Sequence, residues 1–172
     1  FFERKAMLRE IFTLLNNGSN VELVGPRKIG KSSLLKAIER TALDLLTVQR
    51  EPIYIDFNWV NGEDDFYEAL CHFLKIENCQ GGGFAFKRAL EARKPVLLLL
   101  DEIEKMNWEG FTKQILSFLR GLAEGRDAPL KLVMAASNSL DILFPDNHDG
   151  IMTSPIFNVF QLKLYQYFHN IK

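Results

Sequence analysis

Residues 25–32 constrain the fold of this chain most strongly, because they read G-P-R-K-I-G-K-S and fit the pattern G-x-x-x-x-G-K-[ST]. A strand-like apolar segment, residues 21–24, precedes them, and apolar residues at helical spacing follow over residues 33–46. In a strand, glycine-rich loop and helix, backbone N–H groups and the positive end of the helix dipole surround a polyphosphate. The sequence therefore predicts a phosphate-binding loop between a strand and a helix.

The loop supplies a cation and a hydroxyl at the positions that phosphate chemistry needs. Lys31 is predicted to reach the outer phosphates, and Ser32 to place its hydroxyl on a Mg²⁺ ion. Arg27 and Lys28 could also face solvent and add only diffuse positive potential. The residues expected to bind the nucleotide are Gly25, Pro26, Arg27, Lys28, Ile29, Gly30, Lys31, Ser32 and Ser33.

Composition indicates one ordinary domain. The 172 residues are 47% hydrophobic, enough to bury one core. The net charge of −1 gives no overall signal for nucleic acid or an anionic membrane, and no apolar run reaches the ~18 residues of a membrane span. Cys71 and Cys79 suggest neither a disulfide framework nor a metal site, which favours a reduced, cytoplasmic setting. Because the chain starts at Phe1, we expect a piece of a longer protein.

Helical and strand patterns alternate along the chain. Strands are predicted at residues 21–24, 52–57, 96–100, 131–136 and 159–164, and helices at 3–15, after the loop, from 64, up to about 93 and at 108–123. Residues 81–83 are expected to break a helix, and residues 141–158 to be rich in loops. Such alternation predicts an α/β fold with a mainly parallel sheet.

Two carboxylates, Asp101 and Glu102, directly follow the apolar strand at residues 96–100. In a parallel sheet, ligands bind beyond the carboxyl ends of the strands, where the phosphate-binding loop is also expected. Asp101 could then hold Mg²⁺ through a water molecule, and Glu102 could polarise a water molecule for attack on the γ-phosphate. The alternative is that the two carboxylates are a solvated strand end. The combination of this Asp-Glu pair with the upstream loop favours a hydrolytic site.

The absence of the sequence patterns N-K-x-D and D-x-x-G argues against a GTPase. With its loop and its Asp-Glu pair, the chain resembles AAA+-like and STAND-type P-loop ATPases of bacteria and archaea. The resemblance extends to the start of the chain, where Glu3 stands before Arg4 in place of the glycine of F-x-G-R. It also includes three later segments, residues 54–56, 132–138 and 154–158.

The resemblance implies a three-layer P-loop NTPase core, with a five-stranded, mainly parallel sheet of order 5-1-4-3-2 and helices on both faces. Ser137 or Asn138 would then point at the γ-phosphate as a sensor, although a strand-end cap is an equally good interpretation. Asn58 is interpreted either as a restraint on Glu102 in an off state or as an ordinary strand-end residue. Arg120 and Arg126 are possible charge stabilisers, with Arg126 a weak arginine-finger candidate and a surface salt bridge the alternative.

The expected domain covers residues 1–172, with an N-terminal helix at 3–15 and a nucleotide-binding core at 20–165. Relatives of this kind carry a helical lid after the last strand, which we expect to be missing here. The expected ligands are ATP or ADP and Mg²⁺, with Lys31 and Glu102 as catalytic residues. We therefore expect a Mg-dependent ATPase that is weak as an isolated domain.

Three functions remain open at this point. The first is the nucleotide switch of a STAND or AAA+-like signalling or defence protein, whose partners are its own other domains and possibly further copies. The second is the ATPase core of a DNA-handling initiator or motor, although the charge of the chain does not indicate nucleic acid. The third is a nucleotide-binding interaction module without hydrolysis, against which the intact Lys31, Ser32, Asp101 and Glu102 argue.

Overall fold

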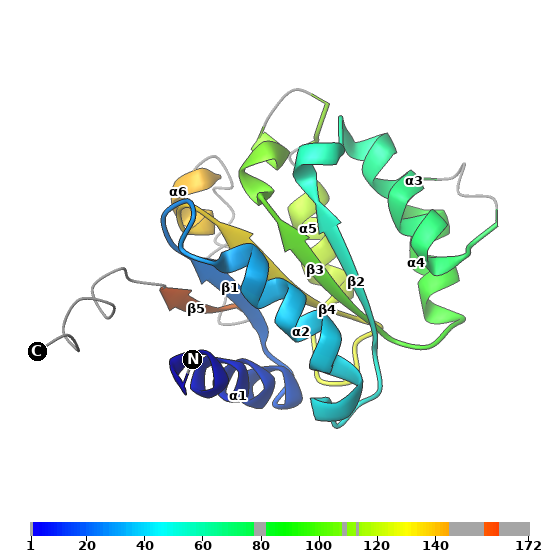
Figure 1. Ribbon diagram of the computed structural model, residues 1–172. Coiled ribbons are helices and arrows are strands. Elements are labelled where there is room, and N and C mark those ends of the chain that lie inside the picture. The colour runs from blue at the N-terminus through cyan, green and yellow to red at the C-terminus, as the bar shows by residue number, and fades with distance from the viewer. Residues whose placement is uncertain (1, 78–81, 108–109, 113, 145–156, 162–172) are drawn as a thin grey trace, which may run out of the picture.

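The computed structural model describes residues 2–77, 82–107, 110–112, 114–144 and 157–161. Helices and strands alternate along the chain (Figure 1). The helices are α1 (Phe2–Asn16), α2 (Lys31–Leu45), α3 (Glu63–Leu74), α4 (Gly82–Glu91), α5 (Gln114–Leu122) and α6 (Leu140–Leu143), with the 3-10 helices η1 (Phe57–Trp59) and η2 (Ile103–Asn107). The strands are β1 (Asn20–Val24), β2 (Glu51–Asp56), β3 (Val96–Asp101), β4 (Leu130–Ala136) and β5 (Phe157–Gln161).

These strands form one parallel sheet in the order β2-β3-β4-β1-β5. The four strands whose side chains are described follow the expected order 1-4-3-2, and β5 pairs with the outer side of β1. β4 therefore separates β1 from β3. Because the strands are parallel, their C-terminal ends share one edge of the sheet, here called the carboxyl edge; the opposite edge is the amino edge.

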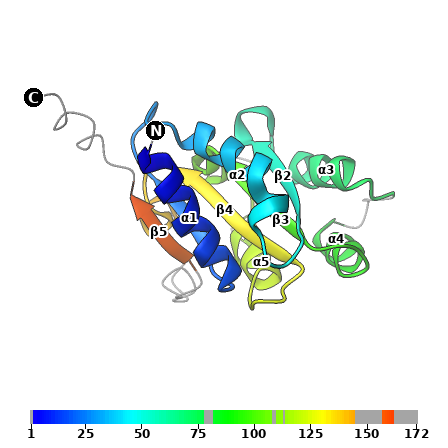
Figure 2. The same cartoon turned by 60° about the horizontal axis from the view of Figure 1, so that its bottom comes forward.

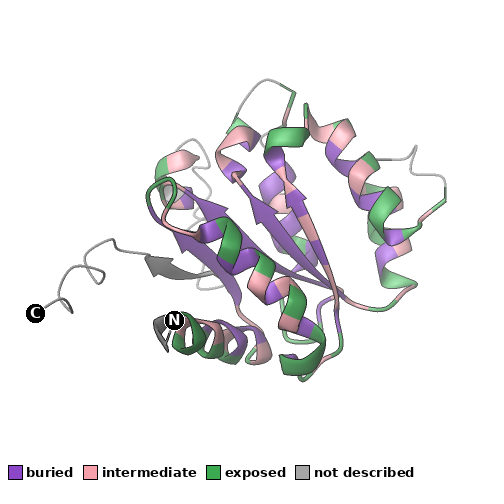
Figure 3. Ribbon diagram, in the orientation of Figure 1, coloured by how far each residue is buried: buried purple, intermediate pink, exposed green. Residues whose placement is uncertain are grey.

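Helices cover both faces of the sheet (Figures 1 and 2). On one face, α1 and α2 pack on alternate strand residues such as Leu23, Leu99 and Val133. On the other face, α3, α4 and α5 pack on the intervening residues, such as Leu98 and Leu132. β3 is buried along its whole length (Figure 3), which is why its sequence is an unbroken apolar run. The predicted α/β class, with a parallel sheet between helices, is confirmed.

Two predicted features of the α3–α5 region were wrong. The helix expected over residues 108–123 begins only at Gln114, after Gly110, whose φ of +98° is incompatible with a right-handed helix. Gly82 and Gly83 do not break a helix but form the first turn of α4. Glycine lowers helix propensity, yet the apolar face of α4 packs Phe86 and Leu90 into the core and outweighs that cost.

Near the end of the chain the boundaries also differ from those expected. The segment predicted as loop over residues 141–158 contains most of the short helix α6 and the start of β5. β5 occupies Phe157–Gln161 instead of 159–164. Short strands at a sheet edge carry a weak sequence pattern, so their limits depend on pairing with the neighbouring strand.

Two further expectations concern the setting of the protein. Cys71, which is buried in α3, is disulfide-bonded, whereas the sequence favoured reduced cysteines. Pairing depends on the separation of Cα atoms, which sequence spacing does not specify, and Cys79 lies outside the described residues. In the described part of the chain, no helix is both long and apolar enough to cross a membrane.

Candidate functional site

The loop between β1 and α2 has the backbone shape that anion binding requires. Gly30 has φ of +102° and Lys28 has φ of +63°, so the chain turns sharply before α2 begins at Lys31. The first turn of a helix leaves backbone N–H groups without helical partners, and these are available to an anion. The N–H of Gly25 donates to the carbonyl of Ala136 over 3.2 Å and thereby ties the loop to the end of β4.

Lys31 is held inside this loop. Its side chain is largely buried, and its ammonium donates to the carbonyl oxygens of Gly25 at 2.6 Å and Pro26 at 2.8 Å. An ammonium has three N–H donors, so one remains for a phosphate oxygen. Ser32 and Ser33 follow as exposed residues of the first turn of α2. The loop geometry suits a polyphosphate.

The N-terminal helix also contacts the loop. A Cβ atom added at Gly30 would lie 2.7 Å from Nη2 of Arg4, so the guanidinium of Arg4 lies directly against this glycine. The sequence resemblance includes Arg4 but assigns it no contact. The structure shows that α1 brings a second cation, besides Lys31, to the phosphate-binding loop.

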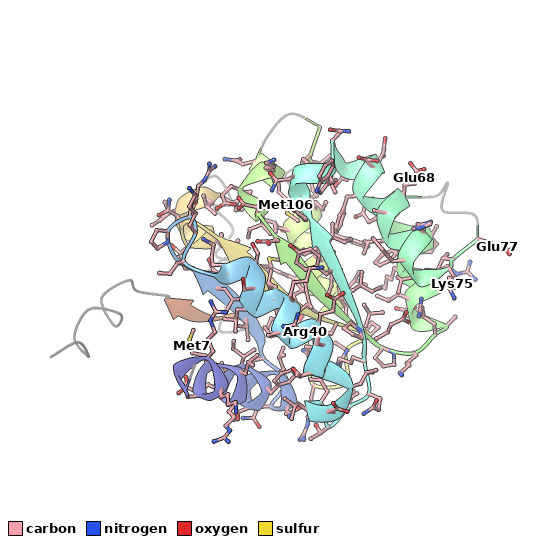
Figure 4. The ribbon with its side chains drawn as sticks, viewed as in Figure 1. Met7, Arg40, Glu68, Lys75, Glu77 and Met106 are labelled. Carbon is pink, nitrogen blue, oxygen red and sulfur yellow. The ribbon has the colours of Figure 1, made fainter. Side chains whose placement is uncertain are left out.

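A groove of about 610 Å³ adjoins the loop on the α1 and α2 side of the sheet. Four of its lining side chains are basic, namely Arg4, Lys5, Lys36 and Arg40, the last of which is labelled in Figure 4. Its remaining lining residues include Leu8, Ser32, Ser33, Leu34, Ala37 and Tyr54. The groove therefore combines positive charge, apolar surface and the start of α2, which are the properties that a nucleotide needs.

Asp101 ends β3 at the carboxyl edge and is 2% exposed. Its Oδ2 accepts a hydrogen bond of 2.8 Å from the hydroxyl of Tyr54, and its Oδ1 accepts one of 3.0 Å from the N–H of Glu102. Burial, followed by this hydrogen bond and nearby carboxylate charges, raises the pKa of Tyr54 well above its ordinary value. Tyr54 therefore stays a donor at neutral pH.

Glu102 adopts φ of +56°, a left-handed conformation that is uncommon for residues other than glycine. Burial raises the pKa of Glu102, and the charges of Glu104 and Asp101 raise it further, while Arg27 and Lys31 oppose them. Because β1 and β3 are parallel, the loop that follows β1 and Glu102, which follows β3, lie at the same carboxyl edge. A carboxylate with a raised pKa beside a phosphate site is suited to accept a proton.

Glu104 is a site residue that the sequence reasoning missed. Its Oε1 accepts a hydrogen bond from the backbone N–H of Ser137, just beyond β4, and its Oε2 is buried with no partner among the described residues. The signal was present, because Glu104 lies two positions after Glu102 and extends the acidic pair. Ser137 thus contacts the carboxylate of Glu104 through its backbone N–H.

The other predicted sensor residues have different surroundings. The side-chain oxygen of Asn58 accepts a hydrogen bond from Lys105, and its backbone N–H donates to Asp56 over 2.9 Å. The restraint of Glu102 by Asn58 stays a prediction. Asn138 is exposed at the carboxyl edge, beyond β4.

The candidate arginines lie away from the loop of their own chain. Arg126 precedes β4 at the amino edge, where its Cα packs against Gly18 and its carbonyl accepts a hydrogen bond of 3.2 Å from Arg50. Arg120 is buried in α5. Neither position lies at the carboxyl edge that holds Asp101.

Two buried cations occupy the amino edge instead. Lys131 donates to the carbonyls of Gly18 at 2.8 Å and Ala123 at 2.6 Å. Arg50 donates to the carbonyl of Ala128 at 2.8 Å. Burial, together with the charge of Arg50, lowers the pKa of Lys131 to about 8. Lys131 and Arg50 therefore bind backbone carbonyls at the amino edge, opposite the edge that holds Asp101.

The residues at the carboxyl edge fit Mg²⁺ by their donor chemistry. Mg²⁺ prefers oxygen ligands and retains several waters, so it needs only one or two ligands from the protein. Ser32 offers a hydroxyl and Asp101 a carboxylate, and Tyr54 connects them because it lines the same groove as Ser32 and bonds to Asp101. No group of three or more potential metal-ligating side chains occurs among the described residues, and Mg²⁺ with a nucleotide requires none.

Comparison with known proteins agrees with this description. A family model described as an AAA domain matches residues 6–144. A search of curated proteins finds no match.

Solved structures with the same fold include the following three proteins. The ORC2 protein of Aeropyrum pernix, in ADPNP-ADP complexes, is 16% identical, with a TM-score of 0.68 over 93% of this chain and 46% of that one. Cdc6p of Pyrobaculum aerophilum is 18% identical, with a TM-score of 0.67 over 92% and 45%. AMPPCP-bound DnaA of Aquifex aeolicus is 20% identical, with a TM-score of 0.57 over 92% and 45%. This chain therefore spans less than half the length of these proteins.

Proposed function

The chain belongs to the AAA domain family, and from this premise we propose that it is the Mg-dependent ATP-binding and ATP-hydrolysing core of a larger nucleotide-switch protein. One observation carries the proposal: the phosphate-binding loop, with Lys31 bound inside it, faces the same carboxyl edge as Asp101 and Glu102. A loop that only bound phosphate would not need a carboxylate with a raised pKa beside it.

In the proposed complex, the β- and γ-phosphates accept hydrogen bonds from the N–H groups of the loop and from the third N–H of Lys31. The nucleoside would extend into the groove between α1 and α2. The hydroxyl of Ser32 and, through water, the carboxylate of Asp101 would hold Mg²⁺, which neutralises charge on the β- and γ-oxygens.

Hydrolysis would proceed by in-line displacement. A water oxygen forms a bond to the γ-phosphorus while the bond from that phosphorus to the bridging oxygen breaks, leaving ADP and phosphate. Glu102 takes the proton that the attacking water loses, and its raised pKa brings it closer to neutral pH, where a base works best. Lys31 balances negative charge on the phosphates during the step.

Calorimetry with Mg-ATP, Mg-ADP and Mg-GTP tests the nucleotide assignment. We expect the wild type to bind Mg-ATP and Mg-ADP, and Lys31→Ala to lose at least tenfold in affinity because the buried ammonium is gone. Lys87→Ala, an exposed lysine on α4, is the matched control and should bind as the wild type does. Binding of Mg-GTP without Mg-ATP would overturn the assignment of ATP.

Single-turnover hydrolysis with Mg-ATP tests Glu102. Glu102→Gln should retain binding and lose hydrolysis by about 10²-fold or more, the range expected for a general base. Robust hydrolysis by Glu102→Gln would remove Glu102 from the proposed mechanism, while binding would remain explained by the loop.

The biological setting has two candidates. A signalling or defence switch of the STAND type is supported by the sequence resemblance. A DNA-handling initiator is supported by the fold, because relatives of the same fold include Drosophila ORC in a structure bound to DNA. Fluorescence anisotropy with labelled duplex DNA, with and without ATP, separates them. Binding that weakens steeply with salt would favour the initiator, and no binding by the full-length protein would favour the switch.

A further inference from the structure

Tyr54 connects two neighbouring strands at the proposed metal site. It lies on β2 opposite Leu99 of β3, two residues before the pair formed by Asp56 and Asp101. Its hydroxyl nevertheless reaches Asp101, with 2.8 Å between Oη and Oδ2. The side chain therefore runs along the sheet toward the carboxyl edge and bonds to the next strand.

The two oxygens of Asp101 are restrained from different directions. Oδ1 accepts the N–H of the adjacent residue, Glu102, at 3.0 Å, and this contact moves with the local backbone. Oδ2 is held by Tyr54, from another strand. A carboxylate that is 2% exposed and bonded at both oxygens has a fixed orientation, and the lone pairs that remain define where a metal-bound water can lie.

The ring of Tyr54 is itself held in place from α2. The ammonium of Lys36 lies 3.6 Å from the ring centroid, the geometry of a cation–π contact. Lys36 is one helical turn after Ser32, so the same face of α2 carries the proposed magnesium hydroxyl and the cation that covers Tyr54. The ring of Tyr54 thus contacts α2 one turn after Ser32, while its hydroxyl bonds to Asp101.

We propose that Tyr54 is a positioning residue that acts through Asp101, fixing the carboxylate so that it holds the water shell of the magnesium-nucleotide complex. This inference rests on the proposed function of the site and adds a residue to it. Partners in the shell behind a metal ligand typically contribute 10- to 100-fold to metal affinity or activity. An effect of that size is expected when only the hydroxyl is removed.

Tyr54→Phe tests the proposal because it keeps the ring, its packing and the contact with Lys36. The first measurement is nucleotide affinity in EDTA, which should stay within about twofold of the wild type. The second is Mn²⁺ binding to the ADP complex, followed by electron paramagnetic resonance, which should weaken about tenfold. Tyr67→Phe is the control, since it removes a hydroxyl from a buried tyrosine on the opposite face of the sheet, and it should leave Mn²⁺ binding unchanged.

A double-mutant comparison shows whether Tyr54 acts through Asp101. In an Asp101→Asn background, Tyr54→Phe should weaken Mn²⁺ binding by less than twofold, because residues that work through one contact are not additive. Unchanged Mn²⁺ affinity in the Tyr54→Phe single variant, or fully additive losses in the double variant, would overturn the proposal. If the wild type itself bound no nucleotide, the proposed function would fail instead, so the two failures are distinguishable.

Discussion

Glu104 accepts a hydrogen bond from the backbone N–H of Ser137 and so joins the segment after β3 to the segment after β4. β3 and β4 pair along their length, and the side chain of Glu104 adds a contact between the segments beyond their C-terminal ends. Glu104 therefore helps to fix the position of Ser137 at the carboxyl edge.

Two substitutions of Glu104 should separate the contribution of its hydrogen-bond acceptor to stability from that of its negative charge. Glu104→Ala leaves the N–H of Ser137 without its partner, which costs about 1–3 kcal/mol when a part-buried donor is unsatisfied. Glu104→Gln keeps an oxygen acceptor and should cost less than half as much. Urea unfolding measures both, with Glu68→Ala, an exposed residue of α3, as the control. Equal losses for the Ala and Gln variants would show that this hydrogen bond contributes little.

The same Gln variant should change the pH dependence of hydrolysis. The negative charge of Glu104 helps to raise the pKa of Glu102, so its removal lowers that pKa toward the ordinary value. Because Glu102 must be deprotonated to act as a base, the acid limb of the single-turnover profile should move to lower pH. A profile that stays in place would mean that Glu102 does not set the acid limb.

Lys131 should make stability rise in mildly alkaline solution. Its pKa is lowered to about 8 in the folded protein, whereas an unfolded lysine titrates near 10.5. Between these values the unfolded state binds more protons, so the free energy of unfolding increases with pH. A neutral amine still has two N–H donors, which suffice for the carbonyls of Gly18 and Ala123.

Urea titrations at pH 7.5, 8.5 and 9.5 check this dependence. The rise should be reduced or lost in Lys131→Met, which fills a similar volume but cannot titrate. Lys94→Met replaces an exposed lysine and should keep the wild-type rise. Parallel curves for the wild type and Lys131→Met would contradict the lowered pKa.

Two glycines near the end of α5 should respond oppositely to alanine. Gly121 lies within the helix with open space around its Cβ position, so Gly121→Ala should stabilise the protein by about 0.5–1 kcal/mol. Gly125 also has open space, but its φ is +93°, so Gly125→Ala should destabilise by about 1 kcal/mol. Thermal unfolding of both variants measures the difference. Stabilisation by both would show that the loop after α5 relaxes freely.

Gly30→Ala should weaken nucleotide binding through the backbone and not through a clash. The added Cβ would meet only the tip of the Arg4 side chain, which can move away, whereas the φ of +102° remains strained. We therefore expect Gly30→Ala to weaken Mg-ADP binding by the same factor in the wild type and in an Arg4→Ala background, as measured by calorimetry. Recovery of affinity in the double variant would show that the steric contact with Arg4 dominates.

Local patterns made the core of this fold predictable. The loop at residues 25–32 has a fixed spacing of glycines and lysine, and β3 is apolar because both of its faces are covered. Such features depend on neighbouring residues and are visible in one sequence. The late start of α5 was not predicted, since its apolar spacing continues upstream while the positive φ of Gly110 appears only in three dimensions.

The supporting contacts of the site could not be read in the same way. The side-chain oxygen of Asn58 binds Lys105 because η1 and η2, which follow strands distant in sequence, pack together. The bond from Tyr54 to Asp101 requires the register of β2 against β3, which the sequence does not specify. Glu104 was the exception, because its spacing from Glu102 was visible and its importance became clear only from the position of Ser137.

β4 is anchored by side chains near both of its ends, through Lys131 at the amino edge and through the Ser137 N–H at the carboxyl edge. A slide of this strand by one residue would break both anchors together with its pairing to β1 and β3. The register of β4 is thus fixed near both of its ends. The positive φ values of Gly30 and Glu102 lie in the segments that follow β1 and β3, the two strands on either side of β4.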